Sequence, residues 1–176
     1  MPAIVSIIGK SGSGKTTLIE KLVPELRRRG YRIGTIKHTV HEVDLDIRGK
    51  DSWRHKAAGA QTVLLAAPHG VSLVKEMQGY ELDDLESYFD DIDLIITEGF
   101  KQGNRPKIEI FRTAVHREPL FSGEPDFIAM VTDSAVERDI PVFGLEDIAG
   151  IADLIEEDVI SRPGWNLHER RKNTMG

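Results

Sequence analysis

Three features of the sequence predict an α/β fold of three layers, with a mostly parallel sheet that carries an antiparallel hairpin at its edge. Ile4–Ile8 is a short, apolar, β-branched run, the kind of segment that forms a buried strand of a parallel sheet. A glycine-rich turn and a helix-like segment follow it, and Tyr31–Ile36 is a second strand-like run, which completes a right-handed βαβ unit. Strand-like and helix-like segments then alternate as far as Glu157, which is typical of this fold class.

Local patterns predict each element. Apolar residues at helical spacing between Leu18 and Leu26 mark the first helix, which ends near Gly30, and Pro24 should kink or shorten it. Two strand-like runs on either side of Pro68-His69-Gly70 predict the hairpin. The later elements expected are a helix over 51–58, strands over 61–67 and 71–75, a helix over 82–89, strands over 92–97, 107–111, 127–132 and 141–143, and a helix over 147–157.

The composition is that of an acidic domain. The 176 residues include 23 Lys and Arg against 29 Asp and Glu, a formal charge of −6, which argues against broad nucleic-acid binding. The absence of cysteine excludes disulfide scaffolds, cysteine-based metal sites and thiol nucleophiles. No apolar run approaches the roughly 20 residues that span a bilayer, and no secretory signal is recognisable, so a cytoplasmic protein without membrane attachment is expected. We expect one domain over 1–160 and a flexible tail over 161–176.

The strongest local signal is Gly9-Lys10-Ser11-Gly12-Ser13-Gly14-Lys15-Thr16, which matches the phosphate-binding pattern G-x-x-x-x-G-K-[ST] in full. Its glycines let the backbone curl so that successive N–H groups converge on phosphate oxygens. Lys15 places a positive charge on the β and γ phosphates, Thr16 offers a hydroxyl to Mg²⁺, and the helix that begins here points its positive end at the anion. The segment, together with Thr17, therefore predicts nucleotide binding.

Lys10 follows the first glycine of this loop. A lysine also stands there in the branch of P-loop proteins that includes the partition ATPases and the nitrogenase iron protein, where it reaches across a dimer to the partner's nucleotide. A solvated lysine in a flexible loop explains the same residue without any such role. The sequence leaves both interpretations open.

A carboxylate that completes the Mg²⁺ site is expected at the end of a strand beside the loop. Asp91–Gly99 resembles a Walker B strand, and Glu98 is the carboxylate at its tip. The polar loop over 37–52 should lie at the same edge of the sheet, because it also follows a parallel strand. Asp51 and Asp46 are the candidates for a further Mg²⁺ ligand from that loop.

Two histidines in the same loop allow other roles. His38 and His41, followed by Asp44 and Asp46, are compatible with a zinc site, although a clear third ligand is missing. Contact with a substrate or phosphate, or plain solvent exposure, explains the histidines equally. Arg54 is a candidate for binding a second anionic group.

Sequence blocks spread over about residues 3–157 resemble the molybdopterin-guanine dinucleotide biosynthesis protein B (MobB) family. They are Gly9–Thr17, Lys37–His41, Asp46–Arg54, Ala58–Ala60, Thr97–Lys101 and Lys107–Arg112. Their combination is far more specific than the phosphate loop alone.

The resemblance implies a P-loop protein that binds GTP with Mg²⁺, hydrolyses it weakly and forms homodimers. It also implies partnership with the guanylyltransferase MobA, which joins GMP to the molybdenum cofactor, so that molybdopterin or the cofactor itself is an expected contact of this site. By position, Lys15 and Glu98 carry over as catalytic residues, and Thr16 and Glu98 as metal ligands. Asp51 is a transfer made by analogy with the related dethiobiotin synthetases.

The base-reading motif of ordinary GTPases, Asn-Lys-x-Asp, is incomplete in this chain. Met130-Val131-Thr132-Asp133 offers Asp133 without the Asn-Lys pair, so this residue is a candidate guanine contact and equally a strand-end or helix-capping residue. No water-positioning glutamine or arginine finger is identifiable, which predicts slow turnover. Two other functions remain open: an ATP-dependent small-molecule kinase or ligase of the dethiobiotin synthetase type, and a non-catalytic nucleotide-binding adaptor.

Overall fold

The computed structural model describes residues 2–162, and the chain forms two compact units. One unit contains the residues up to His38 together with those from Glu86 onward, and the other contains Thr39–Leu85. Of the predicted tail over 161–176, residues 163–176 lie outside the described residues. Within the described part of the chain, no helix combines the length and the apolar character needed to cross a membrane.

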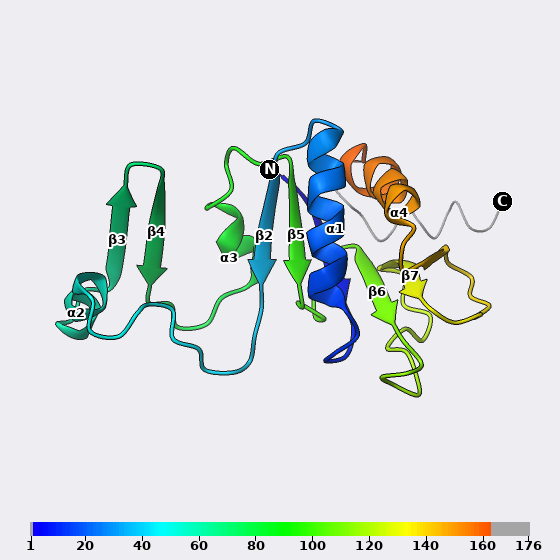
Figure 1. The fold of residues 1–176 in the computed structure, drawn as a ribbon, viewed down its shortest axis with the longest axis horizontal. Helices are drawn as coiled ribbons and strands as arrows, with labels where there is room; N and C mark the ends of the chain where they lie inside the picture. Colours follow the sequence, from blue (N-terminus) through cyan, green and yellow to red (C-terminus); the bar gives the residue numbers. More distant parts are fainter. Residues whose placement is uncertain (1, 163–176) are drawn as a thin grey trace. The chain divides into compact units, whose positions relative to one another are not determined.

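The larger unit is built on a six-stranded sheet in which each pair of neighbouring strands is parallel (Figure 1). The strand order is β2-β5-β1-β6-β7-β8. The strands are β1 (Ala3–Ile8), β2 (Ile33–Lys37), β5 (Leu94–Glu98), β6 (Lys107–Phe111), β7 (Phe127–Thr132) and β8 (Val142–Gly144). The predicted α/β fold class is confirmed, and because all these strands are parallel, the segments that follow them gather at one edge of the sheet.

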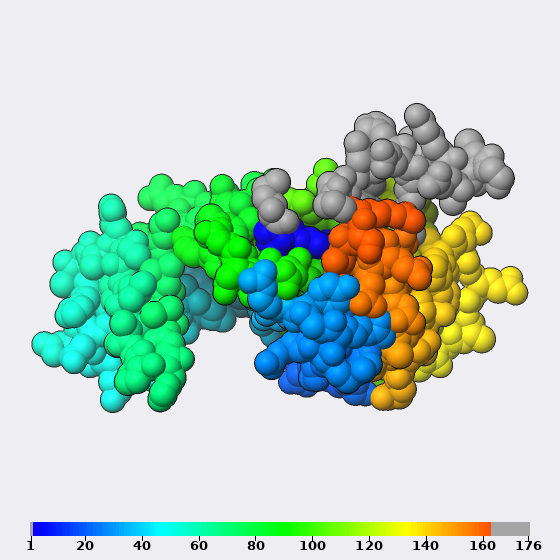
Figure 2. Space-filling model, turned by 90° about the horizontal axis from the view of Figure 1, so that it is seen from above, coloured from blue at the N-terminus to red at the C-terminus, as the bar shows by residue number. Residues whose placement is uncertain are grey.

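Two helices pack side by side on one face of this sheet. They are α1 (Lys15–Arg28) and α4 (Ile148–Ile155), which continues as one π-helical turn, η1 (Glu156–Ile160). Figure 2 shows α1 in blue next to α4 in orange. Helix α1 continues through Pro24 to Arg28, so the alternative that Pro24 shortens it is wrong. Apolar side chains of β1, β5, β6 and β7 complete the core beneath the two helices.

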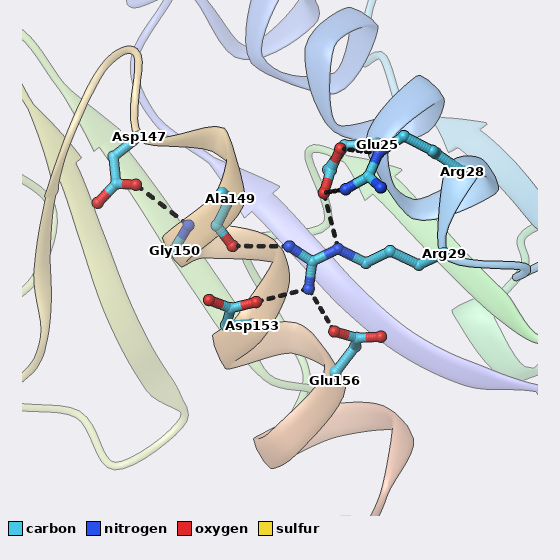
Figure 3. A network of polar contacts seen from close by, with 8 residues as sticks. All are labelled: Glu25, Arg28, Arg29, Asp147, Ala149, Gly150, Asp153 and Glu156. Carbon is cyan, nitrogen blue, oxygen red and sulfur yellow. Dashed lines mark hydrogen bonds and ion pairs between the residues drawn. The ribbon is translucent and has the colours of Figure 1, made fainter.

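Arg29, just past the end of α1, ties the two helices together (Figure 3). Its guanidinium donates to Glu25 of α1 at 2.8 Å, to Asp153 of α4 at 2.6 Å and to Glu156. Hydrogen bonds from Arg28 and from Arg29 lower the pKa of Glu25 to about 2. Glu25 therefore stays ionised at neutral pH, and the network holds α4 against α1.

The opposite face of the sheet carries buried polar groups. Side chains alternate between the faces of a strand, so Ser6 and Thr97 point away from the helices, and their hydroxyls share a 2.9 Å hydrogen bond. Glu109 is fully buried, and its carboxylate accepts hydrogen bonds from the backbone N–H groups of Leu120 at 2.6 Å and Phe121 at 2.9 Å. The loop after β6 is thereby fastened to the sheet.

The smaller unit contains the helix α2 (Asp51–Ala57) and an antiparallel hairpin of β3 (Thr62–Ala67) and β4 (Gly70–Lys75). The hairpin is confirmed, but its predicted place at the edge of the main sheet is wrong, because β3 and β4 form a separate two-stranded sheet. Val63 and Val74, on one face of the hairpin, are buried. Helix α2 of the same unit packs against β3. The short helix α3 (Leu82–Glu86) leads back to β5.

Candidate functional site

The loop between β1 and α1 has a conformation that requires glycine. Gly9, Gly12 and Gly14 have φ angles of +153°, +76° and +102°, in the region that side chains rarely adopt. At Gly9 there is also no space, because a Cβ would lie 2.5 Å from the carbonyl oxygen of Ile110. The loop therefore curls tightly over the end of β6, as the phosphate-binding pattern predicts.

Unpaired polar groups of this loop fit an anionic ligand. Helix α1 has no acidic residue in its first turn, and its first backbone bond runs from the Leu18 N–H to the Gly14 carbonyl, which leaves the N–H groups of Lys15, Thr16 and Thr17 without an acceptor inside the helix. Ser13 is buried, and its hydroxyl has no hydrogen-bond partner among the described residues. Amides at a positive helix end are a ready-made site for phosphate oxygens.

Lys15 lies folded into the loop. Its Nζ donates to the carbonyl oxygens of Gly9 and Lys10, each at 3.1 Å. Burial lowers the pKa of this ammonium, Glu98 acts in the opposite direction, and the positive charges of Lys101 and Lys37 lower the pKa further. A triphosphate would replace the two carbonyl partners with stronger, charged acceptors.

The two metal ligands predicted on α1 and β5 meet in the structure. Oγ1 of Thr16 donates to Oε2 of Glu98 at 2.9 Å, and the Glu98 side chain, at the tip of β5, is only 15% exposed. A hydroxyl and a carboxylate oxygen are ligands that Mg²⁺ accepts, with phosphate oxygens and water filling its remaining positions. No group of three or more His, Cys, Asp or Glu side chains able to hold a metal is found in residues 2–162, so the zinc alternative for the histidines has no support there.

A segment after β6, Arg112–Phe121, borders the phosphate loop and is called the rim segment below. Nε2 of His116 lies 2.8 Å from the carbonyl oxygen of Ser11, and Nζ of Lys10 donates to the carbonyl of Glu118 at 2.9 Å. Lys10 is therefore engaged by a carbonyl of its own chain. The rim segment was not predictable from the sequence, because it has no motif and its contacts arise only from the β1–β6 pairing.

Asp133 follows β7 at the edge of the sheet that carries the phosphate loop. Its carboxylate accepts hydrogen bonds from Nε of Arg112 at 3.2 Å and from the hydroxyl of Ser134 at 3.1 Å. Burial acts to raise the pKa of Asp133, but these hydrogen bonds outweigh it and hold the pKa below its usual value. Asp133 is thus a charged acceptor paired with Arg112, and its role as a guanine contact stays a prediction.

The remaining predicted residues are divided between the two units. His38 belongs to the larger unit, where the centroid of its ring lies 4.6 Å from that of Phe100 and its backbone N–H donates to the carbonyl of Glu98 at 2.9 Å. His41, Asp51 and Arg54 belong to the smaller unit. Asp51 begins α2 with an exposed side chain that lies 3.6 Å from Arg54, so its role as a metal ligand also stays a prediction.

A central parallel strand, a glycine-rich loop, a helix that starts with Lys-Thr and a carboxylate at the tip of the adjacent strand together define a P-loop protein of the α/β class. A family profile described as "Molybdopterin guanine dinucleotide synthesis protein B" (MobB) matches residues 4–133. The chain belongs to the MobB family.

Individual relatives agree with this assignment. The chain is 41% identical over 156 residues to a Haemophilus influenzae protein named molybdopterin-guanine dinucleotide biosynthesis adapter protein, with 87% of each chain covered. It is 37% identical over 163 residues to an Escherichia coli protein of the same name, covering 89% of this chain and 93% of the relative. The crystal structure of Bacillus subtilis MobB is similar with a TM-score of 0.73 at 25% identity, covering 91% of this chain and 99% of that one.

Proposed function

We propose that this protein is an adapter in molybdopterin-guanine dinucleotide biosynthesis that binds GTP with Mg²⁺ and hydrolyses it slowly. The observation that carries the proposal is the contact between Thr16 and Glu98 directly beside the glycine-rich loop, since it unites a phosphate cradle with two oxygen ligands for Mg²⁺. The names of the relatives supply the pathway.

In this proposal each residue has a defined task. The loop amides and Lys15 bind and neutralise the phosphates, while Thr16 and Glu98 hold Mg²⁺. Asp133 accepts hydrogen bonds from the guanine N–H groups. Slow hydrolysis is expected, because no arginine finger or water-positioning glutamine is identifiable in the sequence. A MobA-type guanylyltransferase is the proposed partner, and His38, His41 and Arg54 are proposed contacts of molybdopterin or the molybdenum cofactor.

The nucleotide preference tests the proposal directly. Calorimetric titration with GTP, ATP and their diphosphates, each with and without Mg²⁺, should show one site that prefers GTP and binds it more tightly with the metal. A clear preference for ATP would favour a kinase or ligase of the dethiobiotin synthetase type. Phosphate release at the rate of a protein-free blank, despite tight GTP binding, would favour a non-catalytic adaptor.

The variant Asp133→Asn should change which base is bound. Guanine offers two N–H donors to a carboxylate, whereas xanthine has a carbonyl in place of the amino group and suits the amide of asparagine. We expect GTP affinity to fall by about tenfold or more and xanthosine triphosphate affinity to rise, as measured by competition calorimetry. Asp93→Asn is the matched control, because Asp93 is also paired with an arginine, Arg32, but lies directly before β5. Equal effects of both variants would remove Asp133 from the base site.

We also propose that the protein is a homodimer in which a second copy covers the hairpin. Cross-strand pairing places Leu64, Ala66, Val71 and Leu73 on one face of the hairpin, and all four are exposed. A two-stranded hairpin is marginally stable by itself in water, and a contiguous exposed apolar face is typical of a protein interface. On the opposite face Val63 and Val74 are already buried, whereas Leu65 is exposed.

The variant Leu64→Asp should therefore release monomers. A charge at the centre of the apolar face would have to be buried without a partner, which costs several kcal/mol. Light scattering coupled to size-exclusion chromatography should report half the mass of the unmodified protein. Val142→Asp, at an exposed apolar position of the larger unit, is the control and should leave the mass unchanged. A monomeric unmodified protein would contradict the proposal.

A further inference from the structure

A second lysine, Lys37, lies beside the Glu98 carboxylate at the end of the neighbouring strand β2. β2 and β5 are parallel, and Lys37 and Glu98 are paired in register as the last residues of the two strands. Nζ of Lys37 lies 3.4 Å from Oε1 of Glu98, while Oε2 of the same carboxylate accepts the hydrogen bond from Thr16. One carboxylate thus links Lys37 to the hydroxyl on α1.

Lys37 is able to change partners. Its side chain is 66% exposed, so the ammonium ends a flexible stem that is anchored only at the strand. Its charge also acts on Lys15, as does that of Lys101. Three lysine side chains therefore act on one small region, whereas the phosphate-loop motif accounts only for Lys15.

We propose that the Lys37 ammonium binds the terminal phosphate of a bound nucleoside triphosphate and so makes this site prefer triphosphates to diphosphates. The inference rests on the proposed nucleotide binding and adds a specificity residue to that site. Lys37 is the last residue of β2, so it belongs neither to the phosphate loop nor to the strand that carries Glu98.

Charge balance is the reason for a change of partner. A divalent cation held by Thr16 and Glu98 would neutralise the carboxylate that now attracts Lys37 and would repel its ammonium. A triphosphate brings one more negative charge than a diphosphate, and Lys15 alone does not balance it. The terminal phosphate is then the strongest acceptor within reach of Lys37, and a charge-assisted hydrogen bond forms only when that phosphate is present.

The test compares the affinities of GDP and of the non-hydrolysable analogue GMP-PNP, each with and without Mg²⁺, by calorimetry. Lys37→Met keeps the length of the side chain and removes its charge, and Lys37→Arg keeps the charge. The matched control is Lys21→Met, since Lys21 also pairs with a glutamate, Glu146, on the surface of the same unit at 2.7 Å. Thermal unfolding of each variant checks that the fold is intact.

With Mg²⁺, Lys37→Met should weaken GMP-PNP binding by about tenfold and change GDP binding by less than about twofold, and Lys37→Arg should restore most of the loss. The inference is overturned by either of two results: equal losses for both nucleotides, which indicate that Lys37 only positions Glu98, or affinities equal to those of Lys21→Met. Absence of nucleotide binding by the unmodified protein is a different result, which contradicts the proposed function itself.

Discussion

Replacement of Lys15 by alanine is expected to weaken GTP binding by about a hundredfold or more and to abolish hydrolysis. The ammonium of Lys15 lies inside the loop, held by the carbonyl oxygens of Gly9 and Lys10. Without it, the terminal phosphates would enter a cradle of amides that lacks its central positive charge. Calorimetry with GTP and Mg²⁺, followed by a phosphate-release assay, measures both effects.

The control for this prediction is Lys21→Ala on the same helix. This substitution removes the surface ion pair between Lys21 and Glu146, which contributes at most about 1 kcal/mol to the free energy of folding. Nucleotide affinity should stay unchanged. A Lys15→Ala variant that bound and hydrolysed GTP like the unmodified protein would remove the phosphate loop from the proposed mechanism.

The largest loss of stability is expected from Lys107→Ala. Lys107, the first residue of β6, is 3% exposed; its Nζ forms an ion pair with Asp126 and donates to the carbonyl of Gly103 at 2.7 Å. Burial lowers the pKa of Lys107, with Glu124 acting in the opposite direction. Removing the ammonium leaves the Asp126 carboxylate buried without its partner, which should reduce the free energy of unfolding by about 3–5 kcal/mol. Urea denaturation followed by circular dichroism measures this loss.

A double variant distinguishes the effect of the unpaired charge on stability from the effect of lost packing. In Lys107→Met/Asp126→Leu both charges are replaced by apolar groups, so no charge remains buried, and the stability should recover to within about 1–2 kcal/mol of the unmodified protein. If the double variant is as unstable as Lys107→Ala, packing and not the unpaired carboxylate is the cause.

Local sequence rules predicted the parts of the site that lie within one chain segment. The phosphate loop was predictable, because its glycines, Lys15 and Thr16 have fixed spacing, and Glu98 was predictable because it ends an apolar strand. The contact of Glu98 with Thr16 also follows once the strand order is known, since β5 lies beside β1.

Groups brought together by pairing between distant segments were not predictable. Lys37 becomes a neighbour of Glu98 only through the register of β2 and β5, and His116 meets Ser11 because β6 lies beside β1. The compact unit formed by Thr39–Leu85 was not predicted either. The sequence pattern of its two hairpin strands is the same as that of strands at the edge of a larger sheet. Alternating apolar residues and turn residues predict a hairpin, but they do not predict which other strand, if any, pairs with it.

The rim segment has a consequence for how quickly a ligand can be captured. The bonds from His116 and Lys10 join it to the phosphate loop, and Glu109 anchors its far end, so contacts within the chain itself hold the segment in place. Immobilising backbone costs about 1–2 kcal/mol of conformational entropy per residue, and here that cost is met when the chain folds. The cradle is thus preorganised, so more of the interaction energy with phosphate remains available as affinity, and association need not wait for a slow rearrangement of the loop.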